Sequence, residues 1–254
     1  MKDPWKHLRA DLFGNVEPEV TLVGVSVPIE KSGDLLANAC RVDDGDGPIW
    51  VPRPNWECIE ATTAQAASTS YGSKVKNPQN LNRQLIQKGH LTPLEAIQFN
   101  FHVSGVSKAC GAQMSRHRIG QGHVSRSRRY TRQQPAFVYP LLDYFTDEEI
   151  VSDILFCHSR LNREAYTRYK HALQLGAKKQ DARLLIPVSS ATERVWWVNA
   201  RALRDFFRLR LAKDAECEIR RLANMVFDIV VDLTPSLFED LRRREDEAVQ
   251  DYGQ

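Results

Sequence analysis

The chain contains 254 residues, of which 42% are hydrophobic, and it carries a formal net charge of +3. This composition is typical of a folded globular protein, and the length allows one large domain or two small ones. No apolar run reaches the roughly 20 residues that a membrane helix requires, and the first residues lack the apolar core of a signal peptide. The five cysteines show neither zinc-ligand nor disulfide spacing, so we expect a cytoplasmic protein with no metal site and no membrane partner.

The N-terminal third of the sequence predicts one strand and two helices. Residues 19–29 have strand composition, whereas residues 43–56 are rich in Asp, Gly and Pro and are expected to form a loop. A short helix is expected at residues 60–69 and a second one at residues 80–88. The second helix should end at Gly89, because glycine most easily adopts the left-handed conformation found at helix C-caps.

The segment after Gly89 contains a helix-start signal followed by a strand. Thr92 is a favourable N-cap, Pro93 suits the first helical turn, and Glu95 completes a capping box. From residue 97 to residue 103, apolar and polar side chains alternate, which is typical of a strand with one buried face. The side chains expected on the buried face are those of Ile97, Phe99, Phe101 and Val103.

Helices dominate the rest of the chain. A long helix, capped by Thr146 with Glu149 at the third position, should run to about residue 175. A strand is expected at residues 194–199, where Asn199 caps the next helix. The other expected elements are helices at residues 106–118, 200–211 and 214–232 and a charged tail at residues 242–254. Without a repeat or a clean linker, these elements predict a single mixed α+β domain with long helices.

Positive charge is concentrated in residues 116–132, RHRIGQGHVSRSRRYTR, which hold six arginines and two histidines. No acid occurs between Glu95 and Asp143, so that stretch carries +7 while the rest of the chain carries −4. Such a segment is a solvated loop, an arm for nucleic acid, or a site for phosphate groups. A nucleic-acid-binding protein usually spreads its basic surface more widely. The composition suits a phosphate site, because backbone N–H groups, hydroxyls and planar guanidinium donors all approach phosphate oxygens closely.

Three segments, in the same order, resemble the flavin-dependent thymidylate synthases. They are residues 90–103 (HLTPLEAIQFNFHV), residues 113–130 with an Arg-His-Arg signature, and residues 182–210 with an Asn-Ala-Arg corner between strand and helix. The resemblance implies an antiparallel sheet with long helices and a homotetramer whose active sites lie between subunits. It divides the chain into an N-terminal extension at residues 1–59, a catalytic domain at residues 60–240 and a charged tail at residues 241–254.

The same resemblance implies a reaction and its cofactors. A bound FAD, reduced by NADPH, would serve the transfer of a one-carbon unit from 5,10-methylenetetrahydrofolate to C5 of dUMP and its reduction to a methyl group. Methylene and hydride transfer belong to the cofactors, so the protein is expected to orient them and to exclude water. The partners implied are a small nucleotide and further copies of the chain, with no nucleic acid.

The family's site residues carry over onto matching positions of this chain. Positions implied to contact the nucleotide are Gln113, Arg116, Ser127, Arg128, Arg129, Arg183 and Arg210. Positions implied to contact the flavin are His90, Thr92, Arg116, His117, Arg118, Ile119, Asn199, Arg201 and Asp205, the last standing where the family has asparagine. Arg210 matches the catalytic arginine, which would stabilise the negative charge that activation of C5 places on the pyrimidine ring.

Several of these residues also have an ordinary structural explanation that the sequence leaves open. His90 is also explained as a surface histidine at a helix end, and Asn199 as a simple N-cap. Gln113 and Arg183 are also explained as exposed helix residues. Arg210 also fits the basic face of its helix.

The arginine-rich segment departs from the family pattern. It is one residue longer between Arg118 and Ser127, Ser125 stands in place of the family's nucleotide-site glutamate, and Arg128 replaces a glycine. A lost carboxylate beside a nucleotide bears on how sugar and base are recognised, so UMP is expected to be accepted as well as dUMP. One alternative is a related flavoenzyme that modifies another pyrimidine nucleotide at C5. An alternative of a different class is a nucleic-acid-binding protein that uses the arginine-rich segment.

Overall fold

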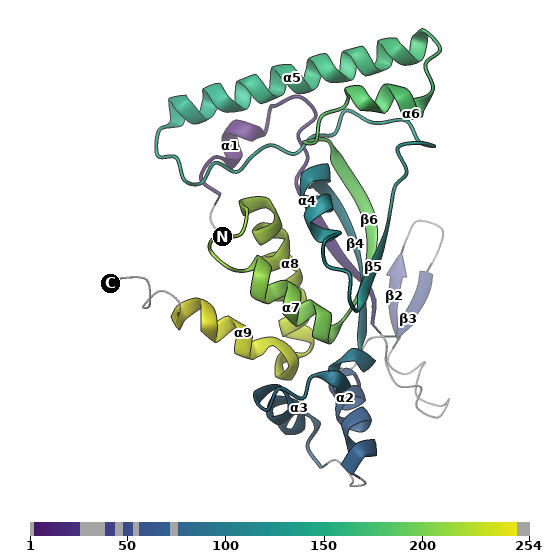
Figure 1. Cartoon of the computed structure of the whole chain (residues 1–254), viewed down its shortest axis with the longest axis vertical. Helices are drawn as coiled ribbons and strands as arrows, with labels where there is room; N and C mark the ends of the chain where they lie inside the picture. The colour runs from purple at the N-terminus through teal and green to yellow at the C-terminus, as the bar shows by residue number, and fades with distance from the viewer. Residues whose placement is uncertain (1–2, 26–38, 44–47, 53–55, 72–75, 248–254) are drawn as a thin grey trace.

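The computed structural model describes residues 3–25, 39–43, 48–52, 56–71 and 76–247 (Figure 1). Its central element is a four-stranded antiparallel sheet with the strand order β1-β4-β6-β5. These strands are β1 (Glu19–Val25), β4 (Gln98–Ser107), β5 (Gln121–Ser125) and β6 (Ala191–Asn199). A separate hairpin pairs β2 (Ala39–Asp43) with β3 (Pro48–Pro52). The predicted mixed α+β domain is confirmed.

Helices lie beside the sheet and at both ends of the molecule (Figure 1). Those in contact with the sheet are α4 (Lys108–Met114), α7 (Ala200–Arg210) and α8 (Cys217–Leu233), which α9 (Pro235–Glu247) follows. At one end lie α5 (Glu148–Gln174), α6 (Lys179–Ala182), η2 (Arg183–Leu185) and α1 (Lys6–Arg9). At the other end lie α2 (Trp56–Tyr71), α3 (Pro78–Gln87) and η1 (Thr92–Ala96). Among the described residues, no helix combines the length and the apolarity needed to span a bilayer.

The core lies between the sheet and the helices α7 and α8. The alternation expected in β4 is confirmed, because the side chains of Ile97, Phe99, Phe101 and Val103 are completely buried. The Trp196 ring of β6 packs between Phe101, at 5.5 Å between centroids, and Phe206 of α7, at 5.2 Å. Each such side chain contributes about 1.5–3 kcal/mol on burial, so aromatic packing fixes α7 against the sheet.

Two of the predicted helix boundaries are confirmed. The helix α3 ends before Gly89, whose φ of 74° is the left-handed conformation that glycine adopts without strain. At the start of α7, the side chain of Asn199 accepts a hydrogen bond from Ala202 N at 2.8 Å. The cap holds the strand-to-helix corner in one geometry, which fixes where the first turn of α7 begins.

Two predicted caps are wrong. Thr92 does not cap: η1 begins after Leu91 without a side-chain cap hydrogen bond, and the Glu95 carboxylate pairs with Arg201 at 2.6 Å instead of closing a capping box. The long helix α5 is capped by Asp147, not by Thr146, and Asp147 Oδ1 accepts from the backbone N–H of Glu149 at 2.9 Å. A carboxylate also interacts favourably with the positive end of the helix dipole.

Other boundaries differ from those expected. Residues 43–56 are not only loop, because they contain β3 and the start of α2, and β5 occupies residues 121–125 of the arginine-rich segment. The helix α9 runs to Glu247, so the expected charged tail is helical in its first part. Residues 26–29 of the first expected strand and residues 248–254 of the expected tail lie outside the described residues.

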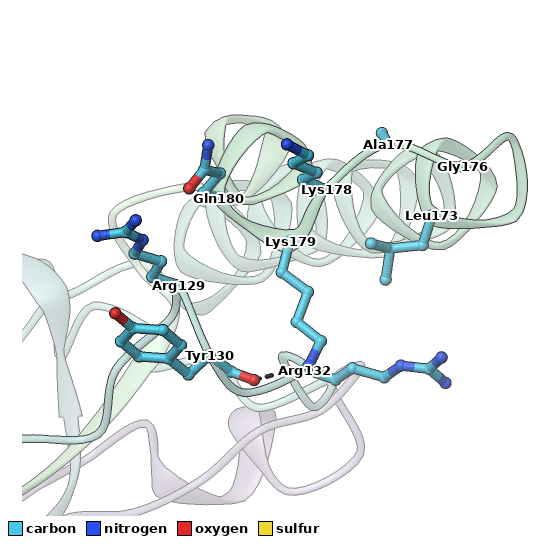
Figure 2. Close-up of a pocket in the computed structure, with 9 residues that line it drawn as sticks. All are labelled: Arg129, Tyr130, Arg132, Leu173, Gly176, Ala177, Lys178, Lys179 and Gln180. Carbon is cyan, nitrogen blue, oxygen red and sulfur yellow. Dashed lines mark hydrogen bonds between the residues drawn. The ribbon is translucent and has the colours of Figure 1, made fainter.

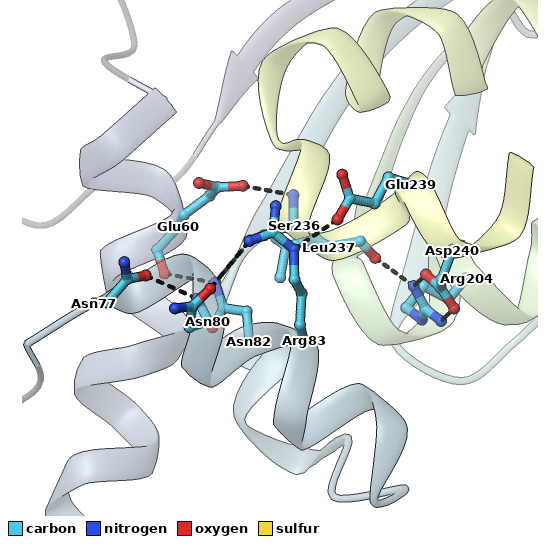
Figure 3. A network of polar contacts seen from close by, with 10 residues as sticks. All are labelled: Glu60, Asn77, Asn80, Asn82, Arg83, Arg204, Ser236, Leu237, Glu239 and Asp240. Carbon is cyan, nitrogen blue, oxygen red and sulfur yellow. Dashed lines mark hydrogen bonds and ion pairs between the residues drawn. The ribbon is translucent and has the colours of Figure 1, made fainter.

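Buried polar contacts attach α9 to its neighbours (Figure 3). The fully buried Arg204 of α7 donates from Nη1 and Nη2 to the Asp240 carboxylate at 2.7 and 2.6 Å. The Glu60 carboxylate of α2 accepts a hydrogen bond from Ser236 N at 2.8 Å. Because a buried charge is costly without a partner, these bonds fix α7, which carries several candidate site residues, to the C-terminal helix.

Candidate active site

The helices α4 and α7 bring three candidate side chains into one group, the Arg210 cluster, which consists of Gln113, His117 and Arg210. Arg210 Nε donates to His117 Nε2 at 3.1 Å, and Arg210 Nη1 donates to Gln113 Oε1 at 3.4 Å. Gln113 belongs to α4, His117 follows that helix, and Arg210 is the last residue of α7. Since both helices pack on the same sheet, the fold gathers residues that lie about 95 positions apart in the chain.

His117 is held in its neutral form within this cluster. Its Nε2 accepts a hydrogen bond from Arg210 Nε, so this nitrogen carries no hydrogen of its own. Burial lowers the pKa of His117, and the charge of Arg210 lowers it further against an opposing contribution from Asp205. The ring also lies edge-on to Phe206, with 5.1 Å between centroids. Arg210 has five N–H donors, and the two bonds to protein leave it able to contact an anion.

A tight corner connects the arginine-rich segment to the start of α7. Gly120 has a φ of 70°, and a Cβ placed on it would lie 2.5 Å from the Asn199 side-chain nitrogen. The Gly120 carbonyl accepts a hydrogen bond from Asn199 N at 2.8 Å. A Cβ on Gly122 would likewise lie 2.5 Å from the Trp197 ring. Both glycines allow the segment to lie directly on β6, and Asn199 uses its side-chain oxygen for the α7 cap.

The candidate arginines at the far end of the segment differ in how they are held. Arg128 Nη2 donates to the carbonyls of Ser190 and Ala191, at 3.1 Å each. Burial lowers the pKa of Arg128, and the neighbouring charge of Arg183 lowers it further. Arg183 is exposed, and its Nε donates to the Gln180 carbonyl at 3.0 Å. Arg128 therefore has a structural role in addition to any contact with a ligand.

Ser127 and Arg129 form a turn beside a cavity. Ser127 Oγ accepts from Arg129 N at 3.3 Å, and the Arg129 guanidinium lies over the Tyr130 ring at 5.4 Å. The cavity, of about 440 Å³, lies between this turn and the connection from α5 to α6 (Figure 2). Its cationic lining residues are Arg129, Arg132, Lys178 and Lys179. We call this space the basic cavity.

The remaining candidates are exposed. Arg116 and Arg118 are exposed and form no ion pair with another described residue, and Ile119 beside them is 91% exposed. Exposed cations next to an exposed apolar side chain suit a ligand that has both phosphates and a planar ring, so this donor set fits a flavin dinucleotide. His90 and Thr92 are also exposed, at the opposite end of the sheet from the basic cavity.

Two candidates on α7 already have partners in the chain. Arg201 forms its ion pair with Glu95 of η1, and Asp205 pairs with Arg208 at 3.2 Å. Both pairs are more than one-third exposed, so each is worth little in water and is readily exchanged for a bound phosphate or amide. The Glu95 contact also holds η1, which begins with Thr92, against α7.

The candidate residues thus form separate groups within one chain. Hydrogen bonds join the Arg210 cluster, and the charges of Arg128 and Arg183 act on each other, but among the described residues no hydrogen bond links these two groups. The arginine-rich segment runs between them along β5 and β6. A ligand that contacts both groups must extend along that segment or contact a second copy of the chain.

Sequence reasoning missed two residues, Glu216 and Arg194, that position the Arg210 cluster. The side-chain nitrogen of Gln113 donates to the carboxylate of Glu216, which precedes α8. Buried Arg194 of β6 donates to the Gly111 carbonyl at 3.1 Å, and a Cβ on Gly111 would lie 1.9 Å from the Arg194 guanidinium. These contacts connect positions 103 and 83 residues apart, so no local pattern in a single sequence reveals them.

Comparisons with known proteins show the family of the chain. The family model for thymidylate synthase complementing proteins matches residues 55–236. The flavin-dependent thymidylate synthase of Thermosipho africanus is 33% identical over 192 residues, which cover 69% of this chain and 82% of the relative. The corresponding synthase of Haloarcula marismortui is 29% identical over 232 residues, covering 81% of this chain and 89% of that protein.

A solved structure with low sequence identity shares the fold. The UMP/dUMP methylase PolB from Streptomyces cacaoi, solved with 5-Br UMP bound, superposes with a TM-score of 0.69 at 20% identity. The match covers 89% of this chain and 95% of that one.

These findings identify an enzyme of the flavin-dependent, methyl-transferring class. The chain belongs to the thymidylate synthase complementing protein family, and the resemblance found in residues 90–103, 113–130 and 182–210 is thereby confirmed. Membership implies a flavin cofactor.

Proposed function

We propose that this enzyme methylates C5 of a uridine nucleotide, taking UMP as well as dUMP, with FAD as bound cofactor and with NADPH and 5,10-methylenetetrahydrofolate as cosubstrates. The observation that carries the proposal is the Arg210 cluster, in which a permanent cation is fixed beside a neutral histidine and a glutamine. Bound FAD supplies the reducing equivalents, received from NADPH, that complete the methyl group. The chain's own residues bind, orient and polarise the nucleotide.

The role of Arg210 follows from the chemistry of uracil. C5 becomes nucleophilic when N3 loses its proton, and negative charge then spreads over N3 and the flanking oxygens. A guanidinium does not accept that proton at any working pH, but it stabilises the anion as it forms. The bonds to Gln113 and His117 hold the guanidinium in one orientation, so little reorganisation is required during the reaction.

The nucleotide phosphate is assigned to the turn at Ser127 and Arg129, with Arg183 nearby. The flavin is assigned to residues 116–119 and to the corner at Asn199 and Arg201. Because the nucleotide groups lie apart in one chain, we infer that the sites form between subunits of a homotetramer, with the Arg210 cluster of one subunit facing the Ser127 turn of another. Exposed apolar side chains near the turn, such as Leu184 at 82% and Val188 at 64%, support such a contact.

Acceptance of UMP is supported by the altered segment. Ser125, which stands where the family has a carboxylate, is paired in register with Arg194 on β6. A glutamate beside the sugar would use its acceptor oxygens and restrict the space there, whereas a serine is smaller and carries both donor and acceptor. The structurally similar methylase PolB is described as a UMP/dUMP methylase.

The experiment is a turnover assay with the flavin-loaded enzyme, NADPH and methylenetetrahydrofolate, offered UMP and dUMP in parallel. Product mass should increase by one methyl group for both nucleotides. Arg210→Gln should lower kcat about 10²–10³-fold, as expected for loss of a charge-stabilising donor, while the bound flavin absorbance stays unchanged. The matched control is Arg168→Gln, which removes an exposed arginine of α5 paired with Glu164.

Two results would contradict the proposal. Normal turnover by Arg210→Gln would show that this side chain does not stabilise the activated ring. Absence of methylated product from either nucleotide, together with salt-sensitive binding to DNA or RNA, would favour the nucleic-acid-binding alternative, in which phosphodiester contacts account for the arginines.

A further inference from the structure

The basic cavity carries more positive charge than one nucleotide phosphate requires. Arg129, Arg132, Lys178 and Lys179 line it, none of its nine lining residues is acidic, and none of the four cations forms an ion pair with another described residue. Four like charges around one space repel each other unless an anion lies between them. A phosphate monoester has a charge of about −2 at neutral pH, which balances only part of this charge.

Lys179 is already oriented toward the arginine-rich segment. Its Nζ donates to the Tyr130 carbonyl at 2.7 Å, so α6 and the turn at residues 127–131 are held together at the cavity (Figure 2). An ammonium group has three N–H donors, and this bond uses one of them. Two donors are left for a ligand, at a nitrogen atom whose position the backbone fixes.

The cavity adjoins the proposed phosphate site of the nucleotide through one shared residue. That residue is Arg129, whose backbone N–H donates to Ser127 Oγ in the turn and which also lines the cavity. A volume of about 440 Å³ falls in the range of ligand sites and is large for one phosphate group. Arg132 and the two lysines therefore lie beyond the proposed first phosphate, where an extension of the same nucleotide would be placed.

We infer that the basic cavity binds the terminal phosphate of a pyrimidine nucleoside diphosphate, so that UDP binds this enzyme more tightly than UMP. The inference rests on the proposed function, since it assigns the first phosphate of the nucleotide to Ser127 and Arg129. The second phosphate accepts hydrogen bonds from Lys179 and Arg132. Its chemistry is binding alone, and no bond to phosphorus is formed or broken.

The test is calorimetric titration of the flavin-loaded enzyme with UMP and with UDP at fixed salt, because ionic strength weakens exposed charge contacts. One added charge-assisted contact corresponds to about tenfold in Kd, so UDP should bind about tenfold more tightly than UMP. Inorganic pyrophosphate, in a third arm, should compete with UDP. Lys179→Gln should remove most of the difference and change UMP binding about threefold or less.

Two further variants keep the test decisive. Arg132→Gln should act in the same direction without breaking the bond between Lys179 and Tyr130, in case Lys179→Gln displaces the turn. Lys76→Gln removes an exposed lysine near α3, at the opposite end of the molecule, and should leave both affinities unchanged. Equal affinity for UMP and UDP, or equal loss of both in Lys179→Gln, would overturn the inference and leave the proposed function standing. If neither UMP nor UDP binds, the result contradicts the proposed function itself, and with it the inference that rests on it.

Discussion

The corner between Gly120 and Asn199 provides a quantitative test of how the arginine-rich segment is positioned. In Gly120→Ala, the new Cβ would lie 2.5 Å from the Asn199 side-chain nitrogen and 2.9 Å from the Ala202 Cβ, on a backbone with a φ of 70°. The left-handed conformation costs a residue with a side chain about 1–2 kcal/mol. Displacing Asn199 costs about a further 1 kcal/mol, because its side chain caps α7. The expected loss in the free energy of unfolding is therefore about 2–3 kcal/mol.

Gly89 supplies the matched control for this substitution. Its φ is 74°, but a Cβ there would have nothing within 4 Å, so Gly89→Ala carries the backbone strain without the collision. Gly89→Ala should cost about 1–2 kcal/mol. The excess of Gly120→Ala over Gly89→Ala thus measures the contact with the α7 corner.

Urea unfolding followed by tryptophan fluorescence, at one fixed protein concentration, measures all of these free energies. Placing Gly120→Ala in an Asn199→Ala background should remove the part of the excess that comes from Asn199, because that side chain and its cap are then already absent, whereas the contact with the Ala202 Cβ remains. If Gly120→Ala costs no more than Gly89→Ala, the corner does not hold the segment as described. Flavin retention, read from absorbance, should fall in Gly120→Ala only.

Three further outcomes are expected. The His117 imidazole, followed by NMR, should titrate below its ordinary pKa of 6.5, and Arg210→Gln should raise that pKa because a neighbouring cation is removed. Since the folded state resists protonation of His117, its contribution makes the free energy of unfolding fall as the pH decreases below 6.5, and His117→Gln should weaken this dependence. Arg204→Met should lower the free energy of unfolding, measured in urea, by about 2–4 kcal/mol. This loss is smaller than that expected for breaking a fully buried ion pair, because the Asp240 carboxylate is 38% exposed.

Local patterns in the sequence predicted the elements whose signals are themselves local. The alternation of β4 is visible because every second side chain is buried in the same core, and Gly89 and Asn199 end or start helices through contacts within a few residues. The predictions that Thr92 and Thr146 cap helices were wrong because, at each helix start, another residue forms the competing interaction. Glu95 pairs with Arg201, 106 residues away, and the adjacent Asp147 supplies a stronger acceptor than a threonine hydroxyl.

The strand β5 was missed for a related reason. Its sequence, QGHVS, has little strand composition, and its position depends on pairing with β6, whose residues lie about 70 positions later in the chain. The contacts between Gln113 and Glu216 and between Arg194 and Gly111 also join distant positions, so they are accessible only from the folded chain. The family resemblance supplied the candidate site residues that composition and spacing alone left open.

Charge distribution gives a physical reason for the proposed assembly of the site from two subunits. A uridine nucleotide placed on the Ser127 turn would meet the cations Arg129 and Arg183 at its phosphate. The Arg210 cluster that would stabilise its ring is not hydrogen-bonded to that group within the described residues. The phosphate site alone would bind any phosphorylated compound, since guanidinium and ammonium groups do not distinguish bases. In the proposed assembly, the Arg210 cluster of another copy selects the pyrimidine. A mixture of Arg210→Gln and Arg129→Gln chains, each inactive alone, should then regain activity in the mixed tetramers. Failure of that complementation, with mixed tetramers shown to form, would place both groups of one site on a single chain.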